Sequence, residues 1–334
     1  LVIYHIMNTS RRKTFTRLLS QAALAAGLSL GGVQAQDSYP SKTIRIVVPY
    51  PAGGGTDTIA RLVGQQLSQR WGQTVLVENR PGASGMLGND HAAKAAGDGY
   101  TVLMGITALV QIPSMYKKVP YQLSDLTPIS QIAKSADVIF TPRSTGIGSI
   151  QELVERAKAQ PGTLNAASYG NATSSHLHIE QFNMKAGTDL MHVPFQGSGP
   201  ETAALLGGQV DIAFVDATAA YPHLQSDKVH ILAVTGSVRH PALPDTPTLG
   251  ELGYNGFEAN GWFGMFVPSS TPRAIVDKLG AEIAAIIQLP EINQRLSDMG
   301  LIPVGSQPDE FAAILDTDAA HWKSIVDAAE ISLD

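Results

Sequence analysis

Segments with the hydrophobic pattern of buried strands alternate along the chain with segments that have the pattern of helices. This alternation predicts an α/β fold. Short runs rich in β-branched residues, typical of buried strands, precede longer segments with apolar residues at helical spacing. This order is typical of parallel sheets covered by helices. The predicted strands are 43–49, 73–79, 100–105, 138–142, 164–168, 191–195, 210–215, 229–235 and 261–268, and the predicted helices are 57–71, 85–96, 149–159, 174–186, 199–207, 272–287, 289–299 and 308–329.

The strand–helix rhythm runs in two series, and one further strand and three helices follow the second series. This pattern predicts two α/β domains that the chain crosses twice, with residues 37–137 and 234–334 in domain 1 and 138–233 in domain 2. Ligands of such sheets bind beyond the carboxyl ends of the strands. Two facing domains therefore imply a ligand cleft that can open and close.

Residues 1–35 predict a cleaved signal peptide. Four basic residues between 11 and 17 precede an apolar core at 22–30, and small residues precede a cleavage site near Ala35 and Gln36. The apolar core is too short for a typical membrane span, and a membrane anchor is the alternative interpretation. The six residues before Met7 suggest a misplaced start. We expect secretion to the periplasm.

Charge and cysteine content exclude several classes of function. The chain has 23 basic and 29 acidic residues, a net charge of −6, and no cysteine. The predicted signal peptide holds four of the basic residues and no acidic one, which leaves a net charge of −10 on the remainder. An acidic chain without a basic cluster is a poor candidate for nucleic-acid binding. Because the chain has no cysteine, disulfides and cysteine metal sites are excluded. We expect a monomer without a cofactor.

The stretch "IRIVVPYPAGGGTDTIARLV" (44–63) resembles a nucleotide-binding turn but lacks the residues that define one. A P-loop needs a lysine that is absent here, and the dinucleotide fingerprint needs a third glycine three positions after the second. Glycines still allow close backbone approach, and a helix N-terminus offers unpaired N–H groups to an anion. Thr56 or Asp57 is expected to cap this helix.

Three more strand-to-helix turns carry small polar residues, and the turn at 168–175 lacks a cation. They are "ENRPGASGMLG" (78–88), "SYGNATSS" (168–175) and "PFQGSGPE" (194–201). Helix N-termini stabilise a nearby anion by roughly 0.3–1 kcal/mol when exposed and up to ~2 kcal/mol when partly buried. Turns of this kind on both domains suit a small carboxylate that can be released again.

Ordered blocks over residues 38–334 resemble the Bug-type (TctC-like) solute receptors, the periplasmic substrate-binding components of tripartite tricarboxylate transporters. The blocks include "VENRPGASGMLG", "AAGDGYTVLMG", "LNAASYGNATSSHLHIEQF" and "LAVTGSVRHPALPDTPTLGELG". The resemblance implies a two-domain periplasmic binding protein fold of the Venus-flytrap, type II-like class, with membrane permease subunits as partners. The residues it implies for the cleft are Tyr50, Ala52, Gly53, Gly54, Gly55, Thr56, Asp57, Ser84, Thr107, Ala108, Ser168, Gly170, Asn171, Thr173, Ser174, Gln196, Gly197 and Asp216.

The chain departs from the family pattern at two places. "ITALVQIP" stands where many members have a polar stretch, so Ala108, Leu109 and Val110 are expected to make one wall apolar. Gln196 stands where lysine is frequent. Both departures favour a monocarboxylate or an aromatic acid over citrate, within the expected class of small mono- and dicarboxylates. A receptor that signals to a membrane histidine kinase is the alternative function.

Enzymatic and metal-binding interpretations are weaker. The sequence "SSHLH" (174–178) lies near Asp189 and suggests a serine hydrolase, but the G-x-S-x-G motif is absent. Adjacent Ser175 and His176 in a helix cannot aim one side chain at the other. The spacing of His176 and His178 places them on different helix faces, so with His192 they are not expected to bind a metal. We expect no catalytic residue and no metal ligand.

Overall fold

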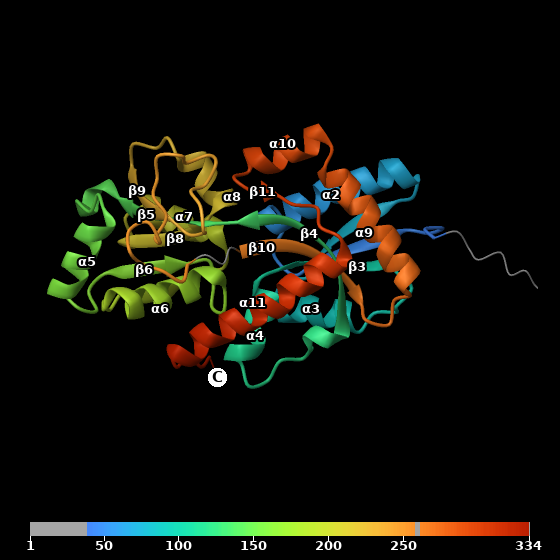
Figure 1. Ribbon diagram of the computed structural model, residues 1–334, viewed down its shortest axis with the longest axis horizontal. Coiled ribbons are helices and arrows are strands. Elements are labelled where there is room, and N and C mark those ends of the chain that lie inside the picture. Colours follow the sequence, from blue (N-terminus) through green and yellow to red (C-terminus); the bar gives the residue numbers. More distant parts are fainter. Residues whose placement is uncertain (1–38, 258–260, 334) are drawn as a thin grey trace, which may run out of the picture. The chain divides into compact units, whose positions relative to one another are not determined.

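The computed structural model describes residues 39–257 and 261–333, and its elements form two sheets (Figure 1). The predicted signal peptide and its cleavage point lie outside these residues. None of the described helices combines the length and the apolar character that crossing a membrane requires.

The first sheet has six strands, and its first three strands in the chain are parallel. The order is β11 (Ile302–Pro303), β4 (Leu126–Ser135), β10 (Gly261–Pro268), β3 (Thr101–Ile106), β1 (Ile44–Val48) and β2 (Val75–Asn79). Strand β1 pairs in parallel with β2 and β3, whereas β10 is antiparallel to β3 and β4. The parallel strands therefore share one carboxyl edge, where the turns into the following helices gather.

Helices cover both faces of this sheet (Figure 1). Helix α2 contacts α9 on one side, and α4 contacts α11 on the other, where α3 also packs. Helix α10 follows α9 directly and contacts it. Their bounds are α2 (Gly55–Trp71), α3 (Met86–Ala93), α4 (Ala108–Met115), α9 (Arg273–Ile287), α10 (Pro290–Asp298) and α11 (Pro308–Ala328).

The second sheet has five strands in the order β7 (Met191–Pro194), β6 (Asn165–Ser168), β8 (Ile212–Asp216), β5 (Asp137–Pro142) and β9 (Val229–Val234). Strand β6 is parallel to β7 and β8, and β5 is antiparallel to β8 and β9. One apolar cluster packs α5 (Ile150–Ala159) and α6 (Ser174–Ala186) on this sheet. A second cluster packs α7 (Ser198–Leu206) and α8 (Ala217–Ala220) on it.

The chain passes from the first sheet to the second at Ala136, between β4, which ends at Ser135, and β5, which begins at Asp137. After β9 ends at Val234, the following segment still packs on the second sheet, where Leu249 and Phe257 belong to its apolar cluster. The start of this segment is bonded to the passage at Ala136. Thr235 N donates to Asp137 O at 2.9 Å, and Asp137 N donates to the Thr235 hydroxyl at 2.8 Å.

Aromatic side chains fill the core between β10 and α11. Trp262, Phe266 and Phe311 lie with ring centroids 5.2–5.9 Å apart, and each is at most 2% exposed. The Trp262 indole N–H donates to Asp318 at 2.8 Å. Burial raises the pKa of that carboxyl to about 6, although this hydrogen bond opposes the rise. The strand over 261–268 is thus mainly a buried core strand.

Four α-helices and strands were not predicted from the sequence, and two of them, α8 and β11, are only four and two residues long. The ten-residue strand β4 carries Pro128, Gln131 and Lys134, so it shows no clear apolar alternation. Helix α4 includes Pro113, which disfavours a helix prediction. Leu109 and Val110 of α4 are at most 3% exposed and belong to the core cluster of the first sheet. The expectation that they line the ligand cleft was therefore wrong.

Candidate functional site

A cleft of about 580 Å³ is lined by turns from both sheets. A smaller pocket of about 70 Å³ shares seven lining residues with it and also includes Ser135 and Gly261, which flank the passage between the sheets. We call this smaller space the inner pocket. The combined lining carries backbone amides, hydroxyls and prolines, and among the described lining residues the only charged side chain is Asp216.

The glycine turn between β1 and α2 forms one wall of the cleft. Helix α2 begins after Gly54, which is extended and makes no side-chain cap. Asp57 instead reaches back and accepts from Gly53 N at 2.9 Å. The first amides of this 17-residue helix therefore face the cleft together with Gly55 and Thr56. Such an end stabilises an anion without a cationic side chain.

Asp57 holds the glycine turn in place. Its carboxylate accepts from Asn79 Nδ2 at 3.0 Å and from Arg61 Nε at 3.0 Å, besides the amide of Gly53. Burial alone would raise the pKa of Asp57, but these hydrogen bonds and the Arg61 charge lower it below its ordinary value. Asn79 Nδ2 also donates to Tyr50 O at 3.1 Å, which ties the turn to the end of β2.

The turn after β2 supplies a second wall. Ala83 and Ser84 adopt left-handed φ values of 48° and 55°, and the Tyr50 hydroxyl donates to Ser84 O at 3.5 Å. Ser84 thereby lies on the cleft beside Tyr50.

The turn after β6 supplies a third wall, from the second sheet. The Thr173 hydroxyl accepts from His176 N at 3.5 Å and donates to Gly170 O at 2.7 Å, so it caps α6 and closes the turn. Gly170 and Ala172 have positive φ values of 150° and 59°. Gly170, Asn171 and Thr173 face the cleft as a result.

The turn after β7 is bonded to the turn after β6. Phe195 N donates to Ser168 O at 2.9 Å, and Gly197 N donates to Tyr169 O at 3.0 Å. Gly197, with φ 103°, then starts α7. Gln196 and Gly197 lie on the cleft, and the N-terminus of α7 opens onto it through Ser198. Helix starts from both sheets thus border one space.

The described lining of the inner pocket has one acidic residue, Asp216, and also includes hydroxyl and apolar side chains. Asp216 ends β8, is 8% exposed and caps α8 by accepting from Thr218 N at 2.9 Å. The Tyr169 hydroxyl donates to Asp137 at 3.3 Å, and burial together with the nearby Asp137 and Asp216 raises the pKa of Tyr169 well above its ordinary value. Asp137 is also 2.7 Å from His178 Nδ1.

All but two of the residues that the sequence predicted for the cleft line either the cleft or the inner pocket. Those on the cleft or the inner pocket are Tyr50, Ala52, Gly53, Gly54, Gly55, Thr56, Ser84, Thr107, Ala108, Gly170, Asn171, Thr173, Ser174, Gln196, Gly197 and Asp216.

The structure places Asp57 and Ser168 behind the lining. Asp57 is 4% exposed, and its hydrogen bonds hold the turn rather than reach the cleft. Ser168 is fully buried, and its Oγ lies 2.6 Å from His192 Nε2. Such a serine–histidine pair also occurs in hydrolases, but a hydroxyl with no exposed surface cannot receive a substrate from the cleft.

Sequence reasoning missed several lining residues. Tyr169, Ile106, Ser198 and Thr218 line both spaces, and Phe195 lines the cleft. Each directly neighbours a predicted residue or lies two positions from one. The signal that could have found them is their position in the same strand-to-helix turns. Thr218 is the exception, because the four-residue helix α8 is too short to show a period.

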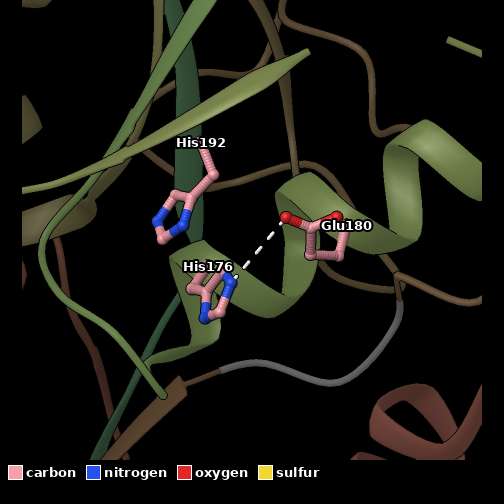
Figure 2. Close-up of side chains that lie close together, drawn as sticks. All are labelled: His176, Glu180 and His192. Atoms are coloured by element: carbon pink, nitrogen blue, oxygen red, sulfur yellow. Dashed lines mark ion pairs between the residues drawn. The ribbon is translucent and has the colours of Figure 1, made fainter. Parts of the chain in front are cut away.

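Figure 2 shows a histidine cluster behind the turn after β6. The rings of His176 and His192 stack with centroids 3.9 Å apart and planes 10° apart, and His176 Nε2 lies 3.7 Å from Glu180 Oε1. Possible ligand atoms of these three residues lie within 4.8 Å of one another. However, an imidazole binds a metal in the plane of its ring, and two nearly parallel rings do not direct their nitrogens to one point.

The stacked rings instead behave as a neutral pair. Burial lowers the pKa of His176 to about 4, and burial together with His176 lowers that of His192 to about 3. Ala172 N donates to His176 Nδ1 at 3.3 Å. The stack therefore supports the backbone of the turn that carries Gly170 and Thr173.

Comparison with known families decides the classification. Residues 59–331 match the model of the tripartite tricarboxylate transporter family receptor. The chain belongs to this receptor family. The match covers most of both sheets, and the family comprises periplasmic receptors that bind substrate. The fold and the family membership predicted from the sequence are confirmed.

Relatives of this receptor extend over nearly its whole length. A protein encoded in the tcbD–tcbE intergenic region of Pseudomonas sp. strain P51 is 36% identical over 323 residues, covering 96% of this chain and 95% of the relative. BugT of Bordetella pertussis is 33% identical and covers 93% and 97% of the two chains.

Solved structures show the same two-domain fold. A protein of R. palustris solved with adipate has a TM-score of 0.84 at 30% identity, covering 88% of this receptor and 99% of that chain. MatC from Rhodopseudomonas palustris, with bound malate, has a TM-score of 0.78 at 30% identity, covering 86% and 100%. The periplasmic binding protein BugD has a TM-score of 0.81 at 32% identity, covering 88% and 99%.

Proposed function

We propose that this receptor captures a small organic mono- or dicarboxylate in the periplasm and delivers it to the membrane permease subunits of a tripartite tricarboxylate transporter. The observation that carries the proposal is the convergence of helix starts and glycine turns from both sheets on one cleft. Unpaired amides at such starts bind carboxylate oxygens. Adipate and malate in the neighbouring structures are ligands of this chemistry.

The proposed mechanism uses two domains, 37–137 with 234–334 and 138–233, each built on one sheet. A carboxylate bound by one domain is enclosed when the other approaches, because turns of both line the cleft. Along the chain, the first sheet is linked to the second at Ala136, and the chain returns to the first sheet between Phe257 and the start of β10 at Gly261. Short links of this kind suit a hinge. The receptor acts as a monomer and performs no chemistry.

The preference for a monocarboxylate or an aromatic acid over citrate is not carried forward, because one of its two supports, an apolar cleft wall of Ala108, Leu109 and Val110, is missing, although Gln196 lies on the cleft. Leu109 and Val110 lie in the core, and only Ala108 of that stretch reaches the inner pocket. The cleft of about 580 Å³ lies within the usual range of ligand sites.

Thermal unfolding tests the proposal. The protein is denatured, dialysed and refolded to remove any retained ligand, then heated with small carboxylates at about 1 mM. A ligand with a Kd near ~1 μM adds about 4 kcal/mol by mass action, which raises Tm by several degrees. We expect at least one mono- or dicarboxylate to do so. Stabilisation by sugars alone would overturn the proposed ligand class.

A further inference from the structure

The inner pocket contains a carboxylate that no basic side chain balances. Asp216 Oδ1 accepts from the amide and the hydroxyl of Thr218, so the bonds of this carboxylate come from neutral groups of its own turn. The side chain is 8% exposed and lines the inner pocket. A buried charge of this kind is costly unless it is paired.

Two other acidic residues, Asp137 and Glu201, lie near Asp216, and their surroundings differ from those of Asp216. Asp137 is 2.7 Å from His178 Nδ1 and accepts from the Tyr169 hydroxyl at 3.3 Å. Glu201 in the first turn of α7 is fully buried, and neither carboxyl oxygen has a partner among the described residues. Burial, and then the charges of Asp216 and Asp137, raise the pKa of Glu201 well above its ordinary value. Burial thus favours the neutral form of Glu201, and Asp137 is hydrogen-bonded by His178 and Tyr169. Neither acidic group supplies a positive charge to Asp216.

The rest of the inner pocket cannot supply a cation either. Its described lining contains no lysine, arginine or histidine, and hydroxyls of Thr56, Thr107, Ser135 and Ser198 surround the space. Its volume of about 70 Å³ admits a small head group, since a water molecule occupies about 30 Å³ in the liquid. A second ligand carboxylate placed here would face Asp216 directly.

We propose that the inner pocket receives the ammonium group of an amino-substituted carboxylate, which pairs with Asp216 Oδ2 while the ligand carboxylate lies at the helix starts of the cleft. This inference rests on the proposed function and narrows its ligand class. Asp216 is then the residue that gives the receptor a higher affinity for amino acids than for organic acids of the same length without an amino group.

Matched acid pairs test the inference on the refolded wild-type protein. The pairs are glutamate with glutarate and aspartate with succinate, measured by calorimetric titration at about pH 7.5. A charge-assisted hydrogen bond corresponds to about tenfold in affinity or more. We expect the amino member of at least one pair to bind at least about tenfold more tightly than its partner.

The variant Asp216→Asn provides the second arm. Asparagine retains an acceptor for Thr218 N and caps helices as well as aspartate, so the fold is preserved. We expect this variant to bind glutamate and glutarate, or aspartate and succinate, equally. Asp227→Asn, an equal change of charge at an exposed turn of the same sheet, is the control and should keep the wild-type preference.

The outcomes separate the two proposals. Equal binding of amino and plain acids by the wild type, or malate binding as tightly as aspartate, would overturn the ammonium site but leave the carboxylate receptor intact. An Asp216→Asn variant that retains the amino preference would also overturn it. Binding of no acid at all would contradict the proposed function itself.

Discussion

Lowering the pH from about 7.5 to about 5 is expected to remove about 2 kcal/mol of stabilisation for each ring of the His176–His192 stack. In the unfolded chain an imidazole takes up its proton near pH 6.5, whereas the folded pKa values are about 4 and about 3. The unfolded state therefore binds more protons at pH 5, and each pH unit below 6.5 costs about 1.4 kcal/mol. This stabilisation is complete above pH 6.5 and is lost as the pH falls.

Other buried groups change stability in the opposite direction, so the measurement must be a difference. Burial raises the pKa of Glu201, of Asp137 and of Glu180, and the folded state is favoured when these carboxyls are protonated. Comparing wild type with His192→Gln cancels most of their contributions.

Urea unfolding at both pH values gives the required free energies. The stability of wild type relative to His192→Gln should fall by about 2 kcal/mol between pH 7.5 and 5. His91→Gln, which replaces an exposed ring on α3, is the control and should follow wild type. A His192→Gln variant with the same pH dependence as wild type would show that the stack is not kept neutral.

Gly55→Ala is expected to weaken binding of the captured acid at least about tenfold and to change the free energy of unfolding by no more than about 1 kcal/mol. Gly55 borders both the cleft and the inner pocket. A Cβ at this position would lie 2.7 Å from the Thr218 hydroxyl, which is bonded to Asp216. The methyl group must therefore displace the α8 cap. Removing one hydrogen bond to a charged ligand group lowers the affinity about tenfold or more.

Affinity should change more than stability in this variant. Displacing the α8 cap costs roughly 0.5–2 kcal/mol, whereas alanine is favoured over glycine in a helix by about 1 kcal/mol and Gly55 has no left-handed φ that alanine would strain. The two effects on folding therefore largely cancel. Gly54→Ala is the comparison, because its Cβ meets only Pro51 O at 3.7 Å and its effect on affinity should be smaller. Equal affinity in Gly55→Ala and wild type would mean that the space beside Thr218 has no role in binding.

The sequence predicted the elements of this receptor well wherever one residue period dominates. The helix over 174–186 and the strand over 261–268 have the bounds predicted for them. These segments have a helix cap at Thr173 and a continuous apolar run, which are local signals. The strand β4 was missed because its buried Ser130 and Gln131 are polar, and its partners β10 and β11 come more than a hundred residues later.

The cleft residues could be predicted because they occur in turns that the sequence marks with glycine and hydroxyl side chains. What the sequence could not show is which side of a turn each side chain takes. Asp57 and Ser168 turn inward, since Asp57 binds the amide of Gly53 and Ser168 lies against His192. The side chain of Tyr169, which lines both spaces, is likewise held by a hydrogen bond to Asp137, 32 residues away in the chain.

Calorimetric titration of the refolded protein with the acids that raise its Tm tests the central claim most directly. The account predicts saturable binding of a small carboxylate with one ligand per chain, and at least about tenfold weaker binding by Gly55→Ala. Binding that is confined to compounds without a carboxylate, or that Gly55→Ala leaves unchanged for every acid, would contradict a carboxylate site at the helix starts of this cleft.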